Sequence, residues 1–216
     1  MNRLFEFIHI KPSPKLVKGP LPIITISREM GSGGKAIANL VAKRLGSPWE
    51  VFDQDDLDDL AKNALAEKKA LKKISEDKIP LIDVILNKIF GRRFQNLSGY
   101  NRHLVRVMTI VGLAGNVVIL GKGGNFLFNY ALKVRVIANY EQRIEWEMTY
   151  EGIDRNEAVK RIEESDTNRQ KSIQELFNHD HKKPYHYDIT IKTSPNLTIE
   201  DATDIIIDLA KRRFKI

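Results

Sequence analysis

Short apolar runs alternate along the chain with segments in which apolar residues recur at helical spacing. The runs are rich in β-branched residues, which favour a pleated sheet, and they predict buried strands. Five such strands are expected, at residues 22–27, 49–52, 117–120, 134–138 and 187–191. Apolar residues three and four positions apart predict helices at residues 34–45, 53–70, 81–90, 101–111, 140–150, from 153 onward and from 198 onward.

This alternation predicts an α/β fold, with a parallel sheet of about five strands and helices on both faces. The helical stretch at 55–112 is longer than a single crossover requires, so part of it is expected to form a helical insertion. Residues 1–21 are interpreted as an N-terminal extension, and 22–216 as a single domain. The polar stretch 170–186 is predicted to be irregular.

Several helix ends are marked by their residue types. Gly46 and Gly91 follow apolar helical patterns and predict C-terminal ends, and residues 112–116 are expected to form a turn. Asp154 is a predicted N-cap. Thr198, with Asp201 three positions later, predicts the start of the closing helix.

The net charge of +7 favours an anionic partner. The basic residues are scattered, and no arginine-rich arm or RNA-binding aromatic motif accompanies them, so a nucleic-acid partner is not expected. No apolar run is long enough to cross a bilayer, and no membrane partner is expected. The absence of cysteine excludes disulfides and suits a cytoplasmic protein. The sequence does not indicate an oligomeric state.

The stretch PIITISREMGSGGKAIA, at residues 22–38, places a glycine-rich turn and Lys35 between a strand and a helix. Backbone N–H groups in such a turn can converge on a phosphate, and the helix N-terminus adds partial positive charge. The match to the Walker A pattern is incomplete, because Glu29 stands at the first glycine and Ala36 replaces the hydroxyl residue. A glycine-rich turn without a ligand is the alternative.

Two further strand ends carry candidate chemistry. The third predicted strand runs directly into a second glycine turn, GKGG, which contains Lys122. The second strand ends at Asp53, which opens an acidic run through Asp59. Interaction with the helix dipole explains most of this run. A metal site is the less favoured alternative, with Asp53 and Asp55 closest to the strand end.

The segment ITISREMGSGGKAIANLVAKRLG resembles the cytidylate kinase-like family of P-loop nucleoside monophosphate kinases. That family's loop commonly has the sequence S-R-E-x-G-S-G-G followed by Arg or Lys. The resemblance spans about residues 22–210 and continues through FDQDDLDDLA, VVILGKGGNFLF, VRVIANYEQRIEWEM, EAVKRIEESDTNR and YHYDITIKTSPNLTIEDATDII.

The resemblance implies a five-stranded parallel sheet, a monophosphate-binding insertion at about 55–112 and a lid at about 152–186. It implies phosphoryl transfer from ATP, with Mg²⁺, to a nucleoside monophosphate, and CMP or dCMP is the expected acceptor. Donor phosphates would lie on Ser27, Arg28, Gly31, Ser32, Gly33, Gly34, Lys35 and Ala36. The acceptor would lie near Asp53, Asp55, Lys122 and Asp166. The implied catalytic residues are Lys35, Lys122 and Arg169, and no residue is assigned as a metal ligand.

The chain departs from the family pattern in the lid. Gln174 and Glu175 stand where another arginine and several tyrosines are usual, and His181 replaces a common tryptophan. Each transition-state arginine can contribute several powers of ten in rate. A catalytically weak nucleotide sensor or regulator is therefore the alternative function, and a basic nucleic-acid-associated domain ranks third.

Other polar residues have competing interpretations. Arg143 and Arg161 are weaker catalytic candidates than Arg169, and pairing with glutamate on the surface is favoured for Arg161. A zinc site at His179, His181 and His186 would lack a fourth ligand, so a solvated loop is favoured there.

Overall fold

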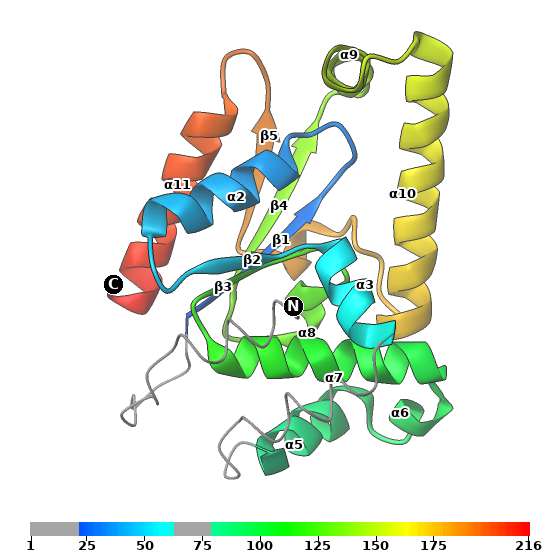
Figure 1. Cartoon of the computed structure of the whole chain (residues 1–216), viewed down its shortest axis with the longest axis vertical. Helices are drawn as coiled ribbons and strands as arrows, with labels where there is room; N and C mark the ends of the chain where they lie inside the picture. Colours follow the sequence, from blue (N-terminus) through cyan, green and yellow to red (C-terminus); the bar gives the residue numbers. More distant parts are fainter. Residues whose placement is uncertain (1–21, 63–78) are drawn as a thin grey trace.

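The computed structural model describes residues 22–62 and 79–216, and Figure 1 shows its elements. Five strands form one sheet in the order β2-β3-β1-β4-β5, and every neighbouring pair is parallel. The predicted parallel α/β sheet is confirmed. The strands are β1 (Ile23–Arg28), β2 (Glu50–Phe52), β3 (Val117–Leu120), β4 (Leu132–Ala138) and β5 (Ile189–Thr193).

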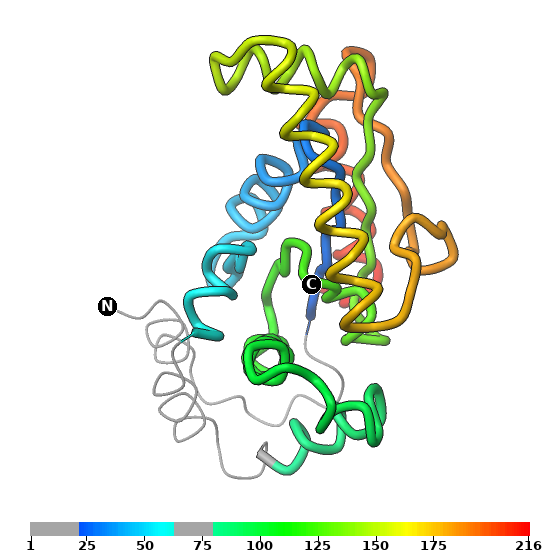
Figure 2. Tube along the Cα trace, turned by 90° about the vertical axis from the view of Figure 1, so that its right-hand side faces the viewer, coloured from blue at the N-terminus to red at the C-terminus, as the bar shows by residue number. Residues whose placement is uncertain are grey.

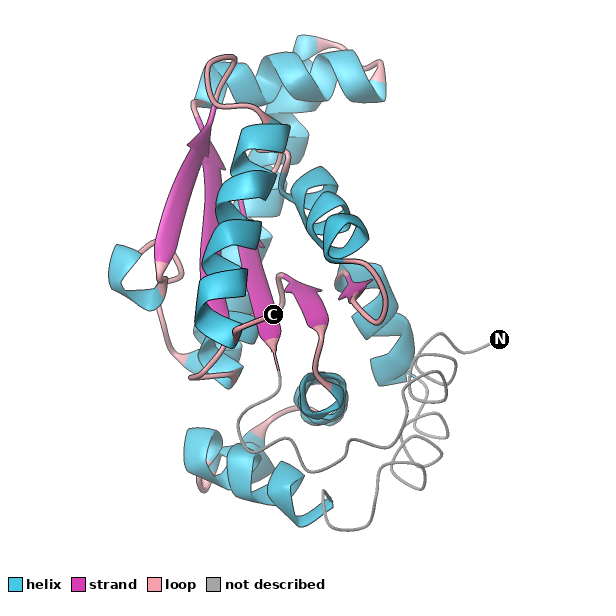
Figure 3. Cartoon of the chain, turned by 90° about the vertical axis from the view of Figure 1, so that its left-hand side faces the viewer, coloured by secondary structure: helices cyan, strands magenta, loops and turns pink. Residues whose placement is uncertain are grey.

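Alternate residues of the strands face two separate cores, because successive side chains of a strand point to opposite faces. In β1, Ile24 and Ile26 pack with helices α2 (Gly34–Leu45) and α11 (Ile199–Phe214). Ile23 packs on the other face, with helices from the rest of the chain. Figure 3 shows the strands as an inner layer between helices, as expected.

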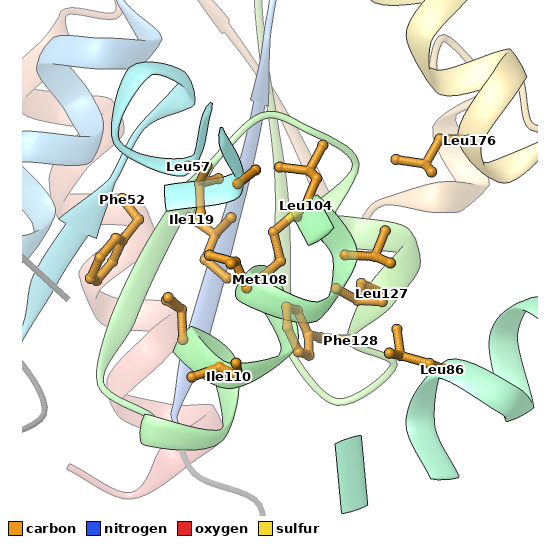
Figure 4. Close-up of a cluster of buried hydrophobic side chains, with 14 of the residues drawn as sticks. Phe52, Leu57, Leu86, Leu104, Met108, Ile110, Ile119, Leu127, Phe128 and Leu176 are labelled. Carbon is orange, nitrogen blue, oxygen red and sulfur yellow. The ribbon is translucent and has the colours of Figure 1, made fainter. Parts of the chain in front are cut away.

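The second core lies beneath the segment between β2 and β3. The helices of that segment are α3 (Gln54–Lys62), α5 (Ile79–Phe90), α6 (Arg93–Asn96) and α7 (Gly99–Ala114). Helix α8 (Gly124–Leu127), which follows β3, also contributes to this core. Leu104 and Met108 of α7 are at its centre, beside Ile119 of β3 (Figure 4). Helix α7 therefore carries the apolar face that attaches this segment to the sheet.

Two long helical segments complete the structure. Helix α9 (Tyr140–Glu151) leads into α10 (Arg155–Phe177), which runs from α9 at one end of the molecule toward α7 at the other (Figures 1 and 2). None of the described helices is both long and apolar enough to cross a membrane.

The predicted caps are present. The side chain of Asp154 accepts a hydrogen bond from the backbone N–H of Glu157 at 2.9 Å. Thr198 and Asp201 form a reciprocal capping box at the start of α11. Helix α2 ends at Leu45, directly before Gly46.

Some element predictions were wrong. Residues 170–177 were expected to be irregular but continue α10, because Ile173, Leu176 and Phe177 are buried in the second core. Helix α7 extends to Ala114, past the expected end at Val111. The expected loop after Gly91 contains α6, and α8 follows the second glycine turn. The expected helix at 53–70 is present at 54–62, and its remainder, like residues 1–21, lies outside the described residues.

Candidate functional site

The first glycine turn is packed tightly between β1 and α2. Gly31 and Gly33 adopt φ angles of 73° and 78°, which few other residues tolerate. A Cβ atom on Gly31 would lie 2.7 Å from the carbonyl oxygen of Arg143, so the loop touches the backbone of α9. On Gly34, a Cβ atom would lie 2.5 Å from Cβ of Arg28. The glycines are therefore required by this packing.

Ser32 and Ala36 differ in what they offer a ligand. The buried Ser32 hydroxyl donates to the carbonyl oxygen of Glu29 at 2.8 Å, and the Ser32 carbonyl accepts from Thr193 Oγ1 at 3.0 Å. The Ser32 hydroxyl also lies 3.3 Å from the carbonyl oxygen of Val136 in β4, so both its side chain and its backbone hold the turn against the sheet. Ala36 lies exposed in the first turn of α2 and has no oxygen for a metal.

Lys35 and Asp53 meet at the carboxyl edge of the sheet, with Nζ 2.8 Å from Oδ2. Burial raises the pKa of Asp53, but the hydrogen bonds from Lys35 and from backbone N–H groups outweigh it and lower the pKa overall. Oδ1 of Asp53 accepts the N–H groups of Asp55 and Asp56 at 3.0 and 3.1 Å, so Asp53 also caps α3. Asp55 itself is exposed.

Arg28 and Arg169 bring two cations to one place at the ends of β1 and β3. A Cβ atom on Gly121 would lie 2.0 Å from Nη1 of Arg28, so that glycine makes room for the guanidinium. Nη1 of Arg169 donates to the carbonyl oxygen of Arg28 at 3.1 Å. Burial, followed by the charge of Arg169, lowers the pKa of Arg28 to about 10. Burial also lowers the pKa of Arg169.

A pocket of about 200 Å³ lies between the second glycine turn and α10. The two guanidiniums and Lys122 supply its positive charge, and none of its lining residues is acidic. The cations would repel one another in this confined space without an anion. The lining residues are Ser27, Arg28, Gln54, Gly121, Lys122, Gly123, Asn125, Ser165, Asn168, Arg169, Ser172, Ile173 and His181.

Lys122 is held by residues of the segment between β2 and β3. Its Nζ lies 2.9 Å from Oδ1 of Asp58 on α3 and 3.4 Å from the hydroxyl of Tyr100 on α7. The Tyr100 hydroxyl also donates to Asp58. Burial, and then the hydrogen bond to Asp58, raises the pKa of Tyr100. An anion entering the pocket would compete with Asp58 for Lys122.

An ionic network behind the first glycine turn was not expected from the sequence. The carboxylate of Glu29 lies 3.4 Å from Arg135 of β4 and 3.7 Å from Arg143 of α9. Arg143 also donates through Nε to the carbonyl oxygen of Met30 at 2.6 Å, and through Nη2 to Asp166 of α10 at 2.7 Å. The network therefore joins the turn to α10.

The substitution of glutamate for the first Walker A glycine was the available sequence signal for this network. Its partners lie more than one hundred residues away along the chain, beyond what local spacing can reveal. Arg143, a weaker catalytic candidate, is buried in the network. Arg161 pairs with Glu157 at 2.8 Å on the surface.

The structure separates the predicted site residues into three groups. Ser27, Arg28, Lys122 and Arg169 line the pocket. Lys35 and Asp53 form an ion pair next to the first glycine turn. Asp166 forms an ion pair with Arg143. Asn125, Ser165, Asn168 and Ser172 also line the pocket, and the sequence did not single them out.

The histidines after α10 lie in an aromatic cluster. His179 stacks on Phe126 with ring centroids 4.9 Å apart, and His186 meets the same ring edge-on at 4.8 Å. His181 is separate from them and lies in the pocket wall. Within residues 22–62 and 79–216, no group of three His, Cys, Asp or Glu side chains could hold a metal ion.

Two solved structures resemble the chain to different degrees. An uncharacterized protein from Eubacterium ventriosum has a similar crystal structure, with 20% identity, a TM-score of 0.60, and coverage of 88% of this chain and 98% of that one. The crystal structure of TT1252 from Thermus thermophilus has 19% identity, a TM-score of 0.49, and coverage of 88% and 98%.

No curated protein matches the chain. At its level of identity, the Eubacterium structure supports the fold alone, an α/β fold with a five-stranded parallel sheet. A family model supplies the relationship, because it matches residues 23–195, most of the chain. The protein belongs to the cytidylate kinase-like family.

Proposed function

We propose that this protein transfers the γ-phosphoryl group of ATP to a nucleoside monophosphate, with CMP or dCMP as the acceptor. The observation that carries the proposal is the meeting of Arg28, Lys122 and Arg169 in one pocket that has no acidic lining residue. Phosphoryl transfer relies on positioning and on cations around the charge that spreads over the transferred group. Family membership supports the same reaction class.

The residues divide between donor and acceptor in this proposal. The first glycine turn, the start of α2 and Lys35 would hold the donor phosphates. The pocket would hold the acceptor phosphate, with Arg28 and Arg169 facing it. An acceptor phosphate oxygen attacks the γ-phosphorus, the bond to the β–γ bridging oxygen breaks, and ADP leaves. Arg169 would stabilise the negative charge on the transferred group.

The carboxylate of Asp53, beside Lys35, suits a magnesium ion that arrives bound to the nucleotide. Mg²⁺ is commonly bound through one or two carboxylates together with substrate phosphates. Asp53 offers a carboxylate at the strand end, whereas Ala36 offers no oxygen. Asp53 would therefore hold the ion, and the ion would neutralise phosphate charge.

The proposal is tested by measuring ADP release with CMP, dCMP, UMP and AMP as acceptors. We expect turnover with a cytidine nucleotide, and turnover lower by about 100-fold in Lys35→Ala. Lys43→Ala is the matched control, because Lys43 is exposed on the same helix. Absence of turnover with every acceptor would contradict the proposal.

The alternative is a nucleotide-binding regulator with weak catalysis. It is favoured by Gln174, which stands where the cytidylate kinase-like family usually carries an arginine. Its Nε2 atom lies 2.8 Å from Oδ1 of Asn178 at the end of α10, and it does not line the pocket. Tight ATP binding by calorimetry, without ADP formation, would favour this alternative.

A further inference from the structure

Two almost completely buried side chains in the pocket wall carry polar atoms without a hydrogen-bond partner among the described residues. These atoms are Nδ2 of Asn125, whose residue is 5% exposed, and Nδ1 of His181, whose residue is 7% exposed. Leaving such an atom unpaired carries a free-energy cost, so native proteins rarely do so without a reason. Thr25 and Gln170 carry similar atoms but do not line the pocket.

The other neutral groups of the pocket suit hydroxyls. Helix α10 presents Ser165, Asn168 and Ser172, whose spacing of three and four places them on one face. The imidazole of His181 is the one ring among the lining side chains, so the described wall offers little surface for stacking a base. The lining therefore combines cations for a phosphate with neutral hydrogen-bonding groups for a sugar.

The size of the pocket leads to the same division. Pockets that bury a drug-sized ligand span about 300–1,000 Å³. This pocket, at about 200 Å³, is smaller and suits only part of a nucleotide. The sugar phosphate is the part that its charges and hydrogen-bonding groups match.

His181 is held in place and is uncharged at neutral pH. Its carbonyl oxygen accepts from Nη1 of Arg135 at 3.0 Å and from the Tyr187 hydroxyl at 2.7 Å. Burial, followed by the charges of Arg135 and Lys182, lowers the pKa of His181 to about 4. Its ring therefore offers a hydrogen bond to a neutral group and adds no charge to the phosphate site.

We infer that Asn125 and His181 hydrogen-bond the ribose hydroxyls of the acceptor while Arg28 and Arg169 hold its phosphate. The pocket then selects a ribonucleotide over the 2′-deoxyribonucleotide, and this narrows the acceptor to CMP. The assignment of this sugar phosphate to the acceptor nucleotide rests on the proposed function. Asn125 and His181 are specificity residues on this account.

Calorimetry on the full chain tests the inference without any turnover. The probes are ribose 5-phosphate, 2-deoxyribose 5-phosphate and inorganic phosphate. Loss of one hydrogen bond to the ligand should cost about three- to tenfold in affinity, so ribose 5-phosphate should bind more tightly than its deoxy analogue by this factor. Equal binding of the two sugar phosphates, or binding of neither, would overturn the inference.

Two variants on different elements locate the contacts. His181→Phe and Asn125→Leu should each lower the affinity for ribose 5-phosphate by about three- to tenfold. Both variants should leave the affinities for inorganic phosphate and for ATP unchanged. Gln170→Leu is the matched control, because it removes a buried unpartnered atom outside the pocket. If His181→Phe does not fold, Asn125→Leu decides. Wild-type affinity in the folded variants would overturn the inference.

The same experiments separate this inference from the proposed function. A protein that prefers ribose 5-phosphate but forms no ADP with any acceptor would retain the sugar-phosphate site and contradict the kinase proposal. A protein that phosphorylates CMP and dCMP with equal kcat/KM would support the kinase proposal and overturn the inference.

Discussion

Nζ of Lys35 lies 2.8 Å from Oδ2 of Asp53, and this pair joins the first turn of α2 to the end of β2. The hydrogen bond that Lys35 donates to Asp53, and then the negative charge of Asp53, raises the pKa of Lys35. Lys35 therefore stays charged, and its side chain remains largely exposed at the edge where donor phosphates are expected. The pair places a cation and a carboxylate oxygen side by side.

Lys35→Ala should weaken ATP binding and lower kcat/KM by about 100-fold, because loss of one preorganised electrostatic contact commonly costs this much. Calorimetry and steady-state kinetics measure the two effects. Lys43→Ala should resemble the wild type. An unchanged ATP affinity in Lys35→Ala would place the donor elsewhere.

Asp58→Asn should strengthen binding of the acceptor phosphate. The Lys122–Asp58 pair is largely buried, so its release is expected to change acceptor affinity by about 1 kcal/mol, or roughly fivefold. The gain should shrink as salt screens the charges. Asp59→Asn, at an exposed neighbour on α3, is the control for the lost charge. Weaker acceptor binding in Asp58→Asn would instead make Asp58 part of the acceptor site.

Glu29→Gln should destabilise the fold, because Arg135 and Arg143 would remain buried without this carboxylate. Breaking a fully buried pair costs about 3–5 kcal/mol. Glu29 keeps 22% of its side chain exposed, so we expect about 1–3 kcal/mol in urea denaturation. Glu157→Gln removes an exposed pair within α10 and should cost less than about 0.5 kcal/mol. Similar losses in the two variants would contradict a structural role for the Glu29 network.

The free energy of unfolding should decrease as the pH falls, and the titration of His181 should account for part of this decrease. Its pKa is about 4 in the folded protein, against an ordinary value of 6.5. The unfolded chain therefore binds a proton between these values while the folded chain does not, so stability is full above pH 6.5 and is lost as the pH falls toward 4. The loss is about 3 kcal/mol at most, since each pKa unit contributes about 1.4 kcal/mol.

The measurement is denaturant unfolding of wild type and His181→Phe across this pH range. The wild type should lose more stability than the variant, because the variant lacks the titrating ring. Asp180 and Asp166, whose charges raise the pKa of His181, partly offset the effect of burial. Parallel pH profiles would show that His181 does not titrate between these values.

The sheet and the first glycine turn could be predicted because their signals are local. Ile23 to Ile26 form a β-branched run, and Gly31 and Gly33 follow it directly. The caps at Asp154 and Thr198 are local as well. The C-terminal part of α10 was missed because its composition is polar, and only the tertiary packing of Ile173 and the residues around Phe177 reveals its buried face.

The site was less predictable than the fold because its contacts join distant parts of the chain. Spacing could place Lys122 at a strand end but could not show that Asp58 holds it. Asn125 follows the second glycine turn and gives no sequence signal of its own. Its burial depends on how α8 packs against the sheet.

The most direct test of the account follows the γ-phosphoryl group itself. ATP labelled at the γ-phosphate is incubated with CMP and the protein, and the nucleotides are separated. We predict labelled CDP with the wild type, and a rate lower by about a thousandfold in Arg169→Ala, because one transition-state arginine can contribute 10³–10⁵. Label that stays in ATP or appears only as inorganic phosphate would contradict phosphoryl transfer to a nucleoside monophosphate.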